Sequence, residues 1–444
     1  MTIGEVRTQY GRVRGAVKQS YAVYRGIPYA TPPVDGRRWR APARPDAWEG
    51  VRPAVVFGSR CTQGSPIQPG SLYHKEFYND DDFIPPMSED CLYLNVWTPA
   101  VDRDEHLPVA VWIHGGAFSG GCGSEMEFDG AAYCERGVIL VTINYRLGPI
   151  GFLAHPELSA ESPSGVSGNY GILDQIAALE WVQENIESFG GDPSRVMVFG
   201  QSAGAMSVQT LVSSTLTRGM VASAIMQSGG GLGGSLSADV SLADAEAQGI
   251  QFAGLAGLTS IEDLRRLSAA EIVELGWRFS QQTHPVRDQL LFAPCVDGYV
   301  MQQGYDETVL KGAHDRIPYI LGSTANDIKM TPEMIARGEK SDLYYSTIRW
   351  SLQDEKLGRT PDHVYYFTRE PLGDDAGAFH SCDLWYMFGT LGRSWRPKDE
   401  HDADLSRRML SYWTNFAKCG DPNGPDVPVW EVCSAANETV LELG

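Results

Sequence analysis

The chain has 444 residues, of which 43% are hydrophobic, and a formal net charge of −20 at pH 7. A chain this acidic repels phosphate, which disfavours a nucleic-acid partner and suits neutral or cationic small molecules. It has no apolar run long enough to span a membrane, and its N-terminus lacks the basic and apolar regions of a signal peptide. We therefore expect a cytoplasmic protein without a membrane partner.

The first half of the chain is predicted to alternate strands and turns with one long helix. Residues 1–50 have the pattern of short strands and turns, and residues 60–88 that of a polar, proline-rich loop region. The apolar runs 109–113 and 138–143 are predicted to be buried strands. Between 169 and 188, the apolar residues Ile172, Ile176 and Leu179 recur on one face of a helix.

The second half of the chain continues this alternation. Strands are predicted over 196–198, 224–226, 319–321 and 363–367, a helix-rich stretch over 240–285, and a final helix over 404–418. Strands that alternate with helices predict an α/β architecture, with a mostly parallel twisted sheet flanked by helices. No linker divides the chain. We expect one domain over 1–444, with inserted segments at about 60–88, 235–310 and 328–360 around the entrance of a site.

The most informative motif is Gly-Gln-Ser-Ala-Gly at residues 200–204, between the strand at 196–198 and the start of a helix. A strand, a tight turn and a helix in that order are the context of a nucleophile elbow. Side chains at Gly200 and Gly204 would collide with the neighbouring strand and helix. The turn is therefore predicted to lift the hydroxyl of Ser202 clear of the sheet, where a base can reach it.

A glycine-rich turn, His-Gly-Gly-Ala-Phe at 114–118, directly follows the strand at 109–113. Such a turn leaves backbone N–H groups unshielded, so that they can stabilise a developing negative charge. We predict an oxyanion hole formed by the N–H groups of Gly116, Ala117 and Ala203, with Gly115 as a supporting residue. The alternative is an ordinary glycine-rich connection.

A serine nucleophile needs a base, and the chain has nine histidines. His380 lies late in the chain, which suits the serine–acid–histidine order of α/β-hydrolases. His114 belongs to the glycine-rich turn, and His155 and His284 precede prolines, which suggests structural roles. Position alone leaves the choice between His380 and the other histidines open.

The base needs an acid to orient it. Asp327 lies just past the strand at 319–321, and catalytic groups sit at the carboxyl ends of strands in open α/β sheets. Asp297 is a rival that has the pattern of a turn aspartate. Asp174 lies on the predicted helix and is interpreted as structural.

Two long stretches make the chain resemble the type-B carboxylesterase family, which includes carboxylesterases and cholinesterases. Residues 189–204 read Phe-Gly-Gly-Asp-Pro-Ser-Arg-Val-Met-Val-Phe-Gly-Gln-Ser-Ala-Gly, and residues 89–99 read Glu-Asp-Cys-Leu-Tyr-Leu-Asn-Val-Trp-Thr-Pro. The likeness runs from residue 24 to residue 424. It implies an α/β-hydrolase fold with inserted lid segments and a bacterial carboxylesterase that needs no cofactor or metal.

Carried over to this sequence, the resemblance implies that Ser202 is the nucleophile and that His380, in a Gly-Ala-x-His pattern, is the base. Asp327 falls where most members have Glu, and Ile328 follows it where they tend to have Gly. This departure concerns the acid and leaves the mechanism unchanged. Ser228 falls on a family serine near these residues; it is expected either to hydrogen-bond the acid or to be a buried turn residue.

The resemblance also bears on the walls of the site. Cys61 and Cys91 fall on a family disulfide, which need not form in a reducing cytoplasm. The short stretch between Asp327 and His380 implies a more open pocket than is usual in the family. Phe118 is expected to line the substrate pocket, with core packing as the alternative. Four aromatic residues in the early loop are expected to roof the pocket: Tyr73, Phe77, Tyr78 and Phe83.

The function implied by the resemblance is hydrolysis of carboxylic esters with short acyl chains, through a Ser-His-Asp triad and an acyl-enzyme. A feruloyl or other aryl ester, or an amide, is the alternative substrate. A catalytically silent adhesion protein, as neuroligins are, is disfavoured because the serine, histidine and carboxylate are all present. The expected partner is a small-molecule ester, and the expected state is a monomer or homodimer.

Overall fold

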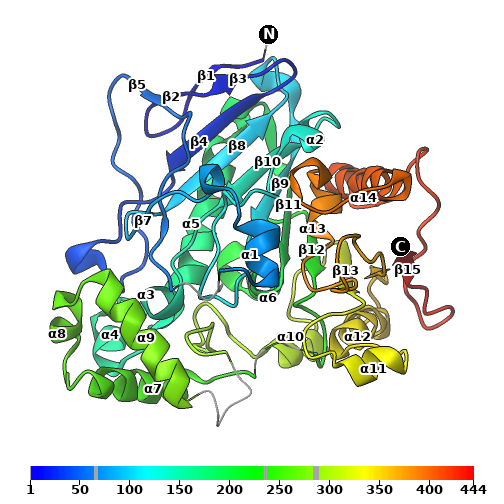
Figure 1. Ribbon diagram of the computed structural model, residues 1–444. Coiled ribbons are helices and arrows are strands. Elements are labelled where there is room, and N and C mark those ends of the chain that lie inside the picture. The colour runs from blue at the N-terminus through cyan, green and yellow to red at the C-terminus, as the bar shows by residue number, and fades with distance from the viewer. Residues whose placement is uncertain (1, 65–68, 235, 237, 284–289) are drawn as a thin grey trace.

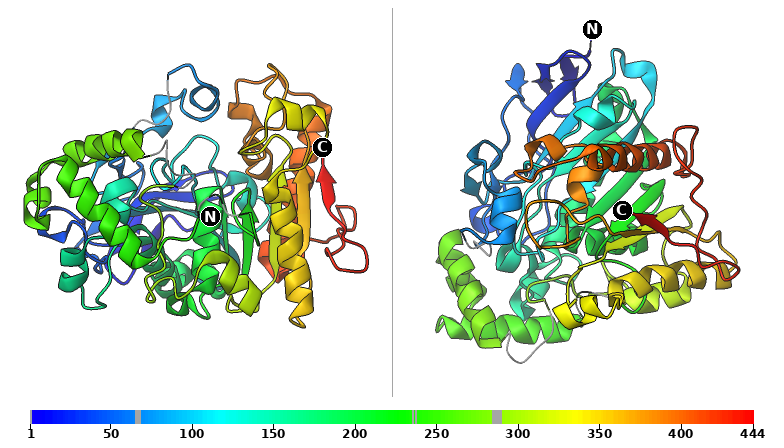
Figure 2. Two further views of the ribbon diagram at one scale, coloured as in Figure 1. Left: turned by 90° about the horizontal axis from the view of Figure 1, so that it is seen from below. Right: turned by 45° about the vertical axis from the view of Figure 1, so that its right-hand side comes forward.

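A ten-stranded sheet forms the centre of the molecule, for which a computed structural model describes residues 2–64, 69–234, 236, 238–283 and 290–444. The strand order is β15-β14-β13-β12-β11-β9-β10-β8-β4-β3 (Figure 1). Seven neighbouring strands run parallel: β9 (Leu107–Ile113), β10 (Ile139–Ile143), β11 (Gly191–Gln201), β12 (Ser223–Gln227), β13 (Tyr319–Thr324), β14 (His363–Phe367) and β15 (Leu441–Leu443). The C-terminal strand β15, in red, lies at one edge of the sheet (Figure 2).

The other edge of the sheet is antiparallel and comes from the N-terminal part of the chain. It contains β8 (Tyr93–Thr98), β4 (Ala22–Pro28) and β3 (Ala16–Val17). Two small sheets lie outside it, one of β1 (Glu5–Arg7), β2 (Arg12–Arg14) and β5 (Val51–Pro53), the other of β6 (Arg60–Cys61) and β7 (Met87–Ser88). The predicted α/β class with a mostly parallel central sheet is confirmed.

The central strands are apolar on both faces because each face is covered. Along β9, Val109, Val111 and Ile113 belong to one hydrophobic core, whereas Ala110 and Trp112 belong to the other. Successive side chains of a strand point to opposite faces of its sheet. A continuous apolar run is typical of a parallel strand buried on both sides, which is why these strands could be located from the sequence.

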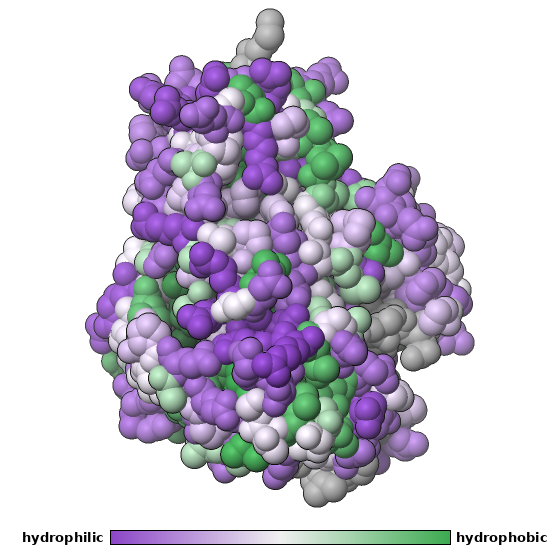
Figure 3. Space-filling model, turned by 90° about the vertical axis from the view of Figure 1, so that its left-hand side faces the viewer, coloured by the Kyte–Doolittle hydropathy of each residue, from purple (hydrophilic) through white to green (hydrophobic). Residues whose placement is uncertain are grey.

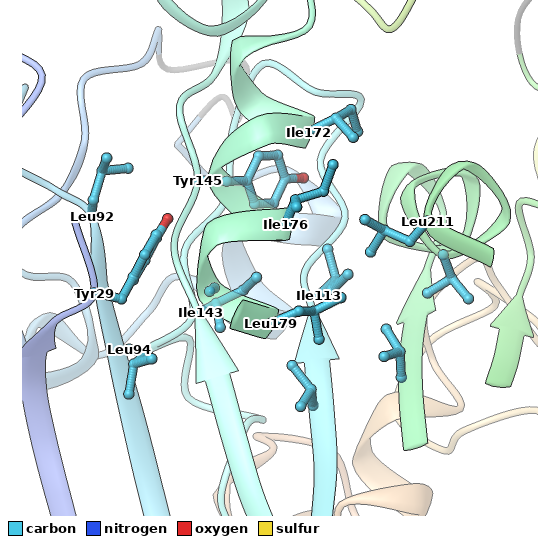
Figure 4. Close-up of a cluster of buried hydrophobic side chains, with 14 of the residues drawn as sticks. Tyr29, Leu92, Leu94, Ile113, Ile143, Tyr145, Ile172, Ile176, Leu179 and Leu211 are labelled. Atoms are coloured by element: carbon cyan, nitrogen blue, oxygen red, sulfur yellow. The ribbon is translucent and has the colours of Figure 1, made fainter. Parts of the chain in front are cut away.

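One face of the sheet is covered by the larger core. Its helices are α3 (Gly148–Phe152), α4 (Pro156–Glu161), α5 (Tyr170–Asn185), α6 (Ala203–Ser213), α7 (Leu242–Leu255), α8 (Ile261–Arg266), α9 (Ala269–Thr283), α10 (Tyr305–Lys311) and α12 (Asp342–Lys356). In α5 the predicted apolar face packs as expected: Ile172, Ile176 and Leu179 lie against the strands of Ile113 and Ile143 (Figure 4).

The opposite face carries a second core. Its helices are α1 (Leu72–Phe77), α2 (Ala131–Cys134), α13 (Leu384–Met387) and α14 (Glu400–Cys419). The short α11 (Pro332–Ala336) buries none of its residues. The final helix, α14, begins at Glu400, four residues earlier than predicted, because Asp399 forms a capping box with Asp402.

Cys61 and Cys91 are joined by a disulfide with a sequence separation of 30. The segment between them contains α1, where only a loop was expected; Ser71 caps this helix by accepting a hydrogen bond from the N–H of His74.

Among the described residues, no helix is both long and apolar enough to cross a membrane. Hydrophilic residues cover much of one face of the molecule, with hydrophobic residues between them (Figure 3).

Candidate active site

Ser202 lies at the sharp turn between β11 and α6, as the motif predicts. Its backbone has φ 58° and ψ −125°, a conformation that costs energy for a residue with a side chain. The turn is held by tight packing: a Cβ atom on Gly204 would lie 2.1 Å from the carbonyl oxygen of Ile113. The N–H of Ser202 donates to the carbonyl of Gln227 at 2.8 Å, which ties the turn to the end of β12.

The glycine-rich turn after β9 lies directly against Ser202. A Cβ atom on Gly115 would be 3.1 Å from Cβ of Ser202, so only glycine fits there. Gly116 and Ala117 have φ of 102° and 55°. Within the described part of the chain, no hydrogen bond occupies the N–H of Gly116, Ala117 or Ala203. These groups are therefore available as donors next to the serine hydroxyl.

The side chain of His114 packs against Tyr145 and contacts the glycine-rich turn. Its ring stacks on Tyr145 with centroids 4.4 Å apart, and its Nδ1 lies 2.8 Å from the carbonyl oxygen of Gly115. Burial lowers the pKa of His114 to about 4, so its ring is neutral at physiological pH. It is a structural part of the turn rather than a base.

His380 and Asp327 form a close pair. Nδ1 of His380 lies 2.5 Å from Oδ1 of Asp327, and both side chains are buried. Asp327 also accepts backbone hydrogen bonds from Thr324 at 3.0 Å and Ile328 at 2.8 Å. Burial alone would raise the pKa of Asp327, but the charge and hydrogen bond of His380 and the further donors lower it below its ordinary value.

Ser228 lies beside this pair, at the end of β12. It is fully buried, and it helps to lower the pKa of Asp327, although its hydroxyl lacks a well-aligned hydrogen bond. Its own N–H donates to the carbonyl of Gly322 at 2.8 Å. Ser228 thus lies close to the carboxylate of Asp327.

Gln201 is a residue of the site that the sequence reasoning missed. Its Nε2 lies 3.0 Å from Nε2 of His380, the nitrogen that would face a nucleophile. Among the described residues, no hydrogen bond joins Oγ of Ser202 to His380. The available signal was its place next to Ser202, which fixes where its backbone lies but not where its amide points.

Ser202 and His380 open into a cavity of about 580 Å³. Its wall comes mainly from the disulfide-bounded segment, the glycine-rich turn and the stretch after that turn, and Ile328 also lines it. The lining residues include Arg60, Gln63, Tyr73, Phe77, Tyr78, Gly115, Gly116, Ala117, Glu125, Glu127, Phe128, Gln201 and Leu384. Of the described residues in 235–310, none lines this cavity. Three of the four aromatic residues expected to roof the pocket are in its wall, and Phe83 is not.

Phe118 does not line the cavity, contrary to the expectation. It is fully buried in the larger core, where its ring meets that of Phe152 with centroids 5.2 Å apart. Its backbone has φ 58°, and its side chain packs in the larger core instead of the cavity wall.

The rival residues have other roles. His155 caps α4 by accepting from the N–H of Glu157, and His284 lies outside the described residues. Oδ1 of Asp297 accepts the N–H groups of a local turn, that of Val300 at 2.8 Å among them. Asp174 forms a buried ion pair with Arg146 at 2.7 Å.

In the parts of the chain that the structure describes, no group of three or more His, Cys, Asp or Glu side chains could hold a metal ion. The arrangement at Ser202 consists of a serine, a histidine–carboxylate pair and free backbone donors. These are the components of nucleophilic acyl transfer.

Comparison with known proteins decides the family. The sequence profile described as "Carboxylesterase family" matches residues 3–348 and 341–444. The chain belongs to the carboxylesterase family.

Two curated relatives of this carboxylesterase are bacterial. The fumonisin B1 esterase of Sphingopyxis macrogoltabida is 41% identical over 94% of this chain and 82% of its own. The para-nitrobenzyl esterase of Bacillus subtilis (strain 168) is 34% identical over 95% of this chain and 91% of its own. Among solved structures, a thermophilic PNB esterase matches with a TM-score of 0.86 and 31% identity, over 100% of this chain and 96% of that one.

These matches confirm the α/β-hydrolase fold and establish the class of reaction. The protein is a carboxylic ester hydrolase of the carboxylesterase family.

Proposed function

We propose that this carboxylesterase hydrolyses esters with short acyl chains, with Ser202 as nucleophile, His380 as base and Asp327 as the orienting acid. The observation that carries the proposal is the convergence of three elements on one cavity: the strained Ser202 turn, the His380–Asp327 pair and the free N–H groups at Gly116 and Ala117.

In the proposed reaction, His380 takes the proton of Ser202 as Oγ attacks the ester carbonyl. Asp327 accepts a hydrogen bond from the Nδ1–H of His380, which holds the proton on Nδ1 and leaves Nε2 free to act as the base. The N–H groups of Gly116, Ala117 and Ala203 stabilise the oxyanion. The alcohol leaves with a proton from His380, and water activated by the same ring releases the acid from the acyl-enzyme.

The side-chain amide of Gln201 must move for these steps to occur. It occupies the position next to Nε2 of His380 that Ser202 needs. Hydrogen bonds of a catalytic site are often misaligned before substrate binds and become aligned in the complex. We expect the Gln201 amide to rotate away from Nε2 when an ester fills the cavity.

The preference for small esters is supported by the cavity volume of about 580 Å³, which is within the usual range for small-molecule sites. A second candidate substrate is an aryl ester. Tyr73, Phe77 and Tyr78 line the cavity and could stack on an aromatic ring, and one relative bears the name para-nitrobenzyl esterase.

The test is hydrolysis of a p-nitrophenyl ester series, from acetate to palmitate, by the wild type and Ser202→Ala. We expect the highest kcat/KM on short chains and a loss of kcat of about 10⁴-fold or more in the variant, as is typical of triad deletions. Ser213→Ala is the matched control: Ser213 lies on the same helix α6, and its hydroxyl has no hydrogen bond among the described residues. Near-normal activity of a folded Ser202→Ala enzyme would contradict the proposal.

A further inference from the structure

Two carboxyl side chains lie buried in the wall of the same cavity. Glu125 and Glu127 are 7% and 1% exposed, and both line the cavity into which Ser202 and His380 open. They come from the stretch that follows the glycine-rich turn, so they are fixed to the same backbone segment as the donors at Gly116 and Ala117. The proposed reaction uses neither of them.

The two carboxyl groups are held differently. Oε1 of Glu125 accepts hydrogen bonds from the hydroxyl of Tyr78 at 2.6 Å and from the N–H of Cys122 at 3.0 Å. Oε2 of Glu127 is buried and accepts no hydrogen bond from a described donor. The side chains of Glu125 and Glu127 interact directly with one another, and burial, together with the charge of Glu125, raises the pKa of Glu127 well above its ordinary value. Burial also raises the pKa of Glu125, so ionisation of both carboxyls is disfavoured without a ligand.

No cation neutralises this pair. Among the described residues, none of the ion pairs includes Glu125 or Glu127. Arg393, which lies near Glu127, already pairs with Asp129 at 2.6 Å and donates to the carbonyl of Met126. Arg60 lines the cavity and acts on Glu125 only through its longer-range charge. Glu125 has structural hydrogen bonds, but a buried carboxyl such as that of Glu127, with an unpartnered oxygen and no counter-ion, costs stability, so a role in folding does not account for Glu127.

We propose that Glu125 and Glu127 form a subsite for a protonated amino group of the ester substrate. This inference rests on the proposed function, because it assigns the substrate class of the same cavity. An ammonium group has three N–H donors, enough to bond both carboxylates at once. Its positive charge favours ionisation of both carboxyls, and any proton they hold leaves to solvent, so that two negative charges face one positive charge beside Arg60.

The neighbouring wall suits a cation as well. Phe77, Tyr78 and Phe128 line the same cavity, and aromatic faces attract ammonium groups. The tyrosine hydroxyl that bonds Glu125 also holds that carboxylate in place, so the charge is preorganised before the ligand arrives. The proposed substrate is therefore an ester that also carries an amine. The amine would lie at Glu125 and Glu127, away from the scissile carbonyl at Ser202.

The test compares three six-carbon ligands as competitive inhibitors of p-nitrophenyl butyrate hydrolysis: hexylammonium, hexanol and hexanoate. In the wild type we expect hexylammonium to bind at least about tenfold more tightly than hexanol, and hexanoate to bind most weakly. Equal inhibition constants for hexylammonium and hexanol would overturn the proposal. Tighter binding of hexanoate would overturn it as well, and would point to Arg60 as the anchor.

Variants locate the effect. Glu127→Gln keeps the shape of the protonated side chain and should remove most of the preference for hexylammonium over hexanol, and Glu125→Gln should do the same. Glu135→Gln is the control. Glu135 is exposed at the end of α2, and its substitution removes the same charge from the molecule. An unchanged preference in both cavity variants would overturn the proposal. If a variant fails to fold, the wild-type ligand series alone still decides.

Calorimetric binding of hexylammonium to Ser202→Ala separates this inference from the proposed function. If hexylammonium binding depends on Glu127 but the wild type hydrolyses no ester of the series, the subsite stands and the proposed reaction is removed. Hydrolysis that is lost in Ser202→Ala, without any preference for the ammonium ligand, would do the reverse.

Discussion

Asp327, the proposed acid, has a side chain one methylene shorter than that of Glu, which the resemblance leads one to expect at this position. The short side chain still reaches His380 because Asp327 sits in a turn whose own N–H groups, those of Thr324 and Ile328, hold the carboxylate. The closeness of the two side chains is thus set by backbone hydrogen bonds and not by side-chain length.

We predict that Asp327→Asn lowers kcat by about 10⁴-fold at neutral pH. An amide that donates to Nδ1 would favour the tautomer with its proton on Nε2, which cannot accept the serine proton. The measurement is kcat on a short p-nitrophenyl ester. Asp297→Asn is the control, since Asp297 serves a local turn away from the cavity. Equal losses in the two variants would argue against Asp327 as the acid.

At this scale the sequence located the residues whose roles depend on the backbone. Ser202 and Gly115 were predictable because a strained turn and a close backbone approach restrict which residues fit. Phe118, Gln201 and Glu127 were not, because their roles depend on which way a side chain turns. Phe118 has a left-handed φ and a side chain in the core, and neither can be read from residue type alone.

Helix α14 shows how charged side chains define an element. Asp402 lies in its first turn, almost fully buried, and accepts hydrogen bonds at 2.7 Å from Arg369 and from the hydroxyl of Tyr386. Together with Asp399 it also caps the helix. The sequence pattern placed the helix start later because the first turn contains hardly any apolar residue. Its boundary depends on caps and a distant arginine, not on hydrophobic periodicity.

We predict that Asp402→Asn destabilises the protein by about 2 kcal/mol at pH 7. Burial raises the pKa of Asp402, but its hydrogen bonds, first of all that with Arg369, lower the pKa from 3.8 to about 2 in the folded protein. This carboxylate therefore stabilises the fold fully above pH 4, and the contribution is lost as the pH falls from about 4 to about 2. Melting temperatures of variant and wild type should differ at pH 7 and converge toward pH 2.

Asp404→Asn is the comparison for this effect. Asp404 lies on the same helix and pairs with Arg407 at the surface. Exposed pairs of this kind contribute at most about 1 kcal/mol. A loss in Asp404→Asn as large as that in Asp402→Asn would show that helix charge, and not the buried contact, is responsible.

On the scale of the whole molecule, the site follows from the sheet. The glycine-rich turn follows β9, Ser202 follows β11, Asp327 follows β13 and His380 follows β14, and carboxyl ends of parallel strands lie along one edge. The sequence predicted this edge because the central strands are continuous apolar runs. The sequence located part of the cavity wall, since Tyr73, Phe77 and Tyr78 were expected there, but not Glu125 and Glu127, whose side-chain directions depend on contacts between residues far apart in the chain.

We predict that reduction of the Cys61–Cys91 disulfide destabilises the protein. Releasing a loop with a sequence separation of 30 returns conformational entropy to the unfolded chain, worth about 3–4 kcal/mol in the chain-entropy treatment. The measurement is the melting temperature with and without dithiothreitol. The double variant Cys61→Ser/Cys91→Ser should melt lower than the oxidised wild type and should not respond to the reductant. A response in that variant would assign the effect to another thiol.

The same disulfide brings the two ends of segment 62–90 together. The Cα atoms of its two cysteines lie 4.9 Å apart. Replacing this segment would reach the site itself, because Tyr73 donates a hydrogen bond to the carbonyl of His380 and Gln63 bonds Gly121 in the stretch after the glycine-rich turn. Such an exchange would also remove Tyr78 from Glu125, so that substrate range and charge preference would change together in a single genetic step.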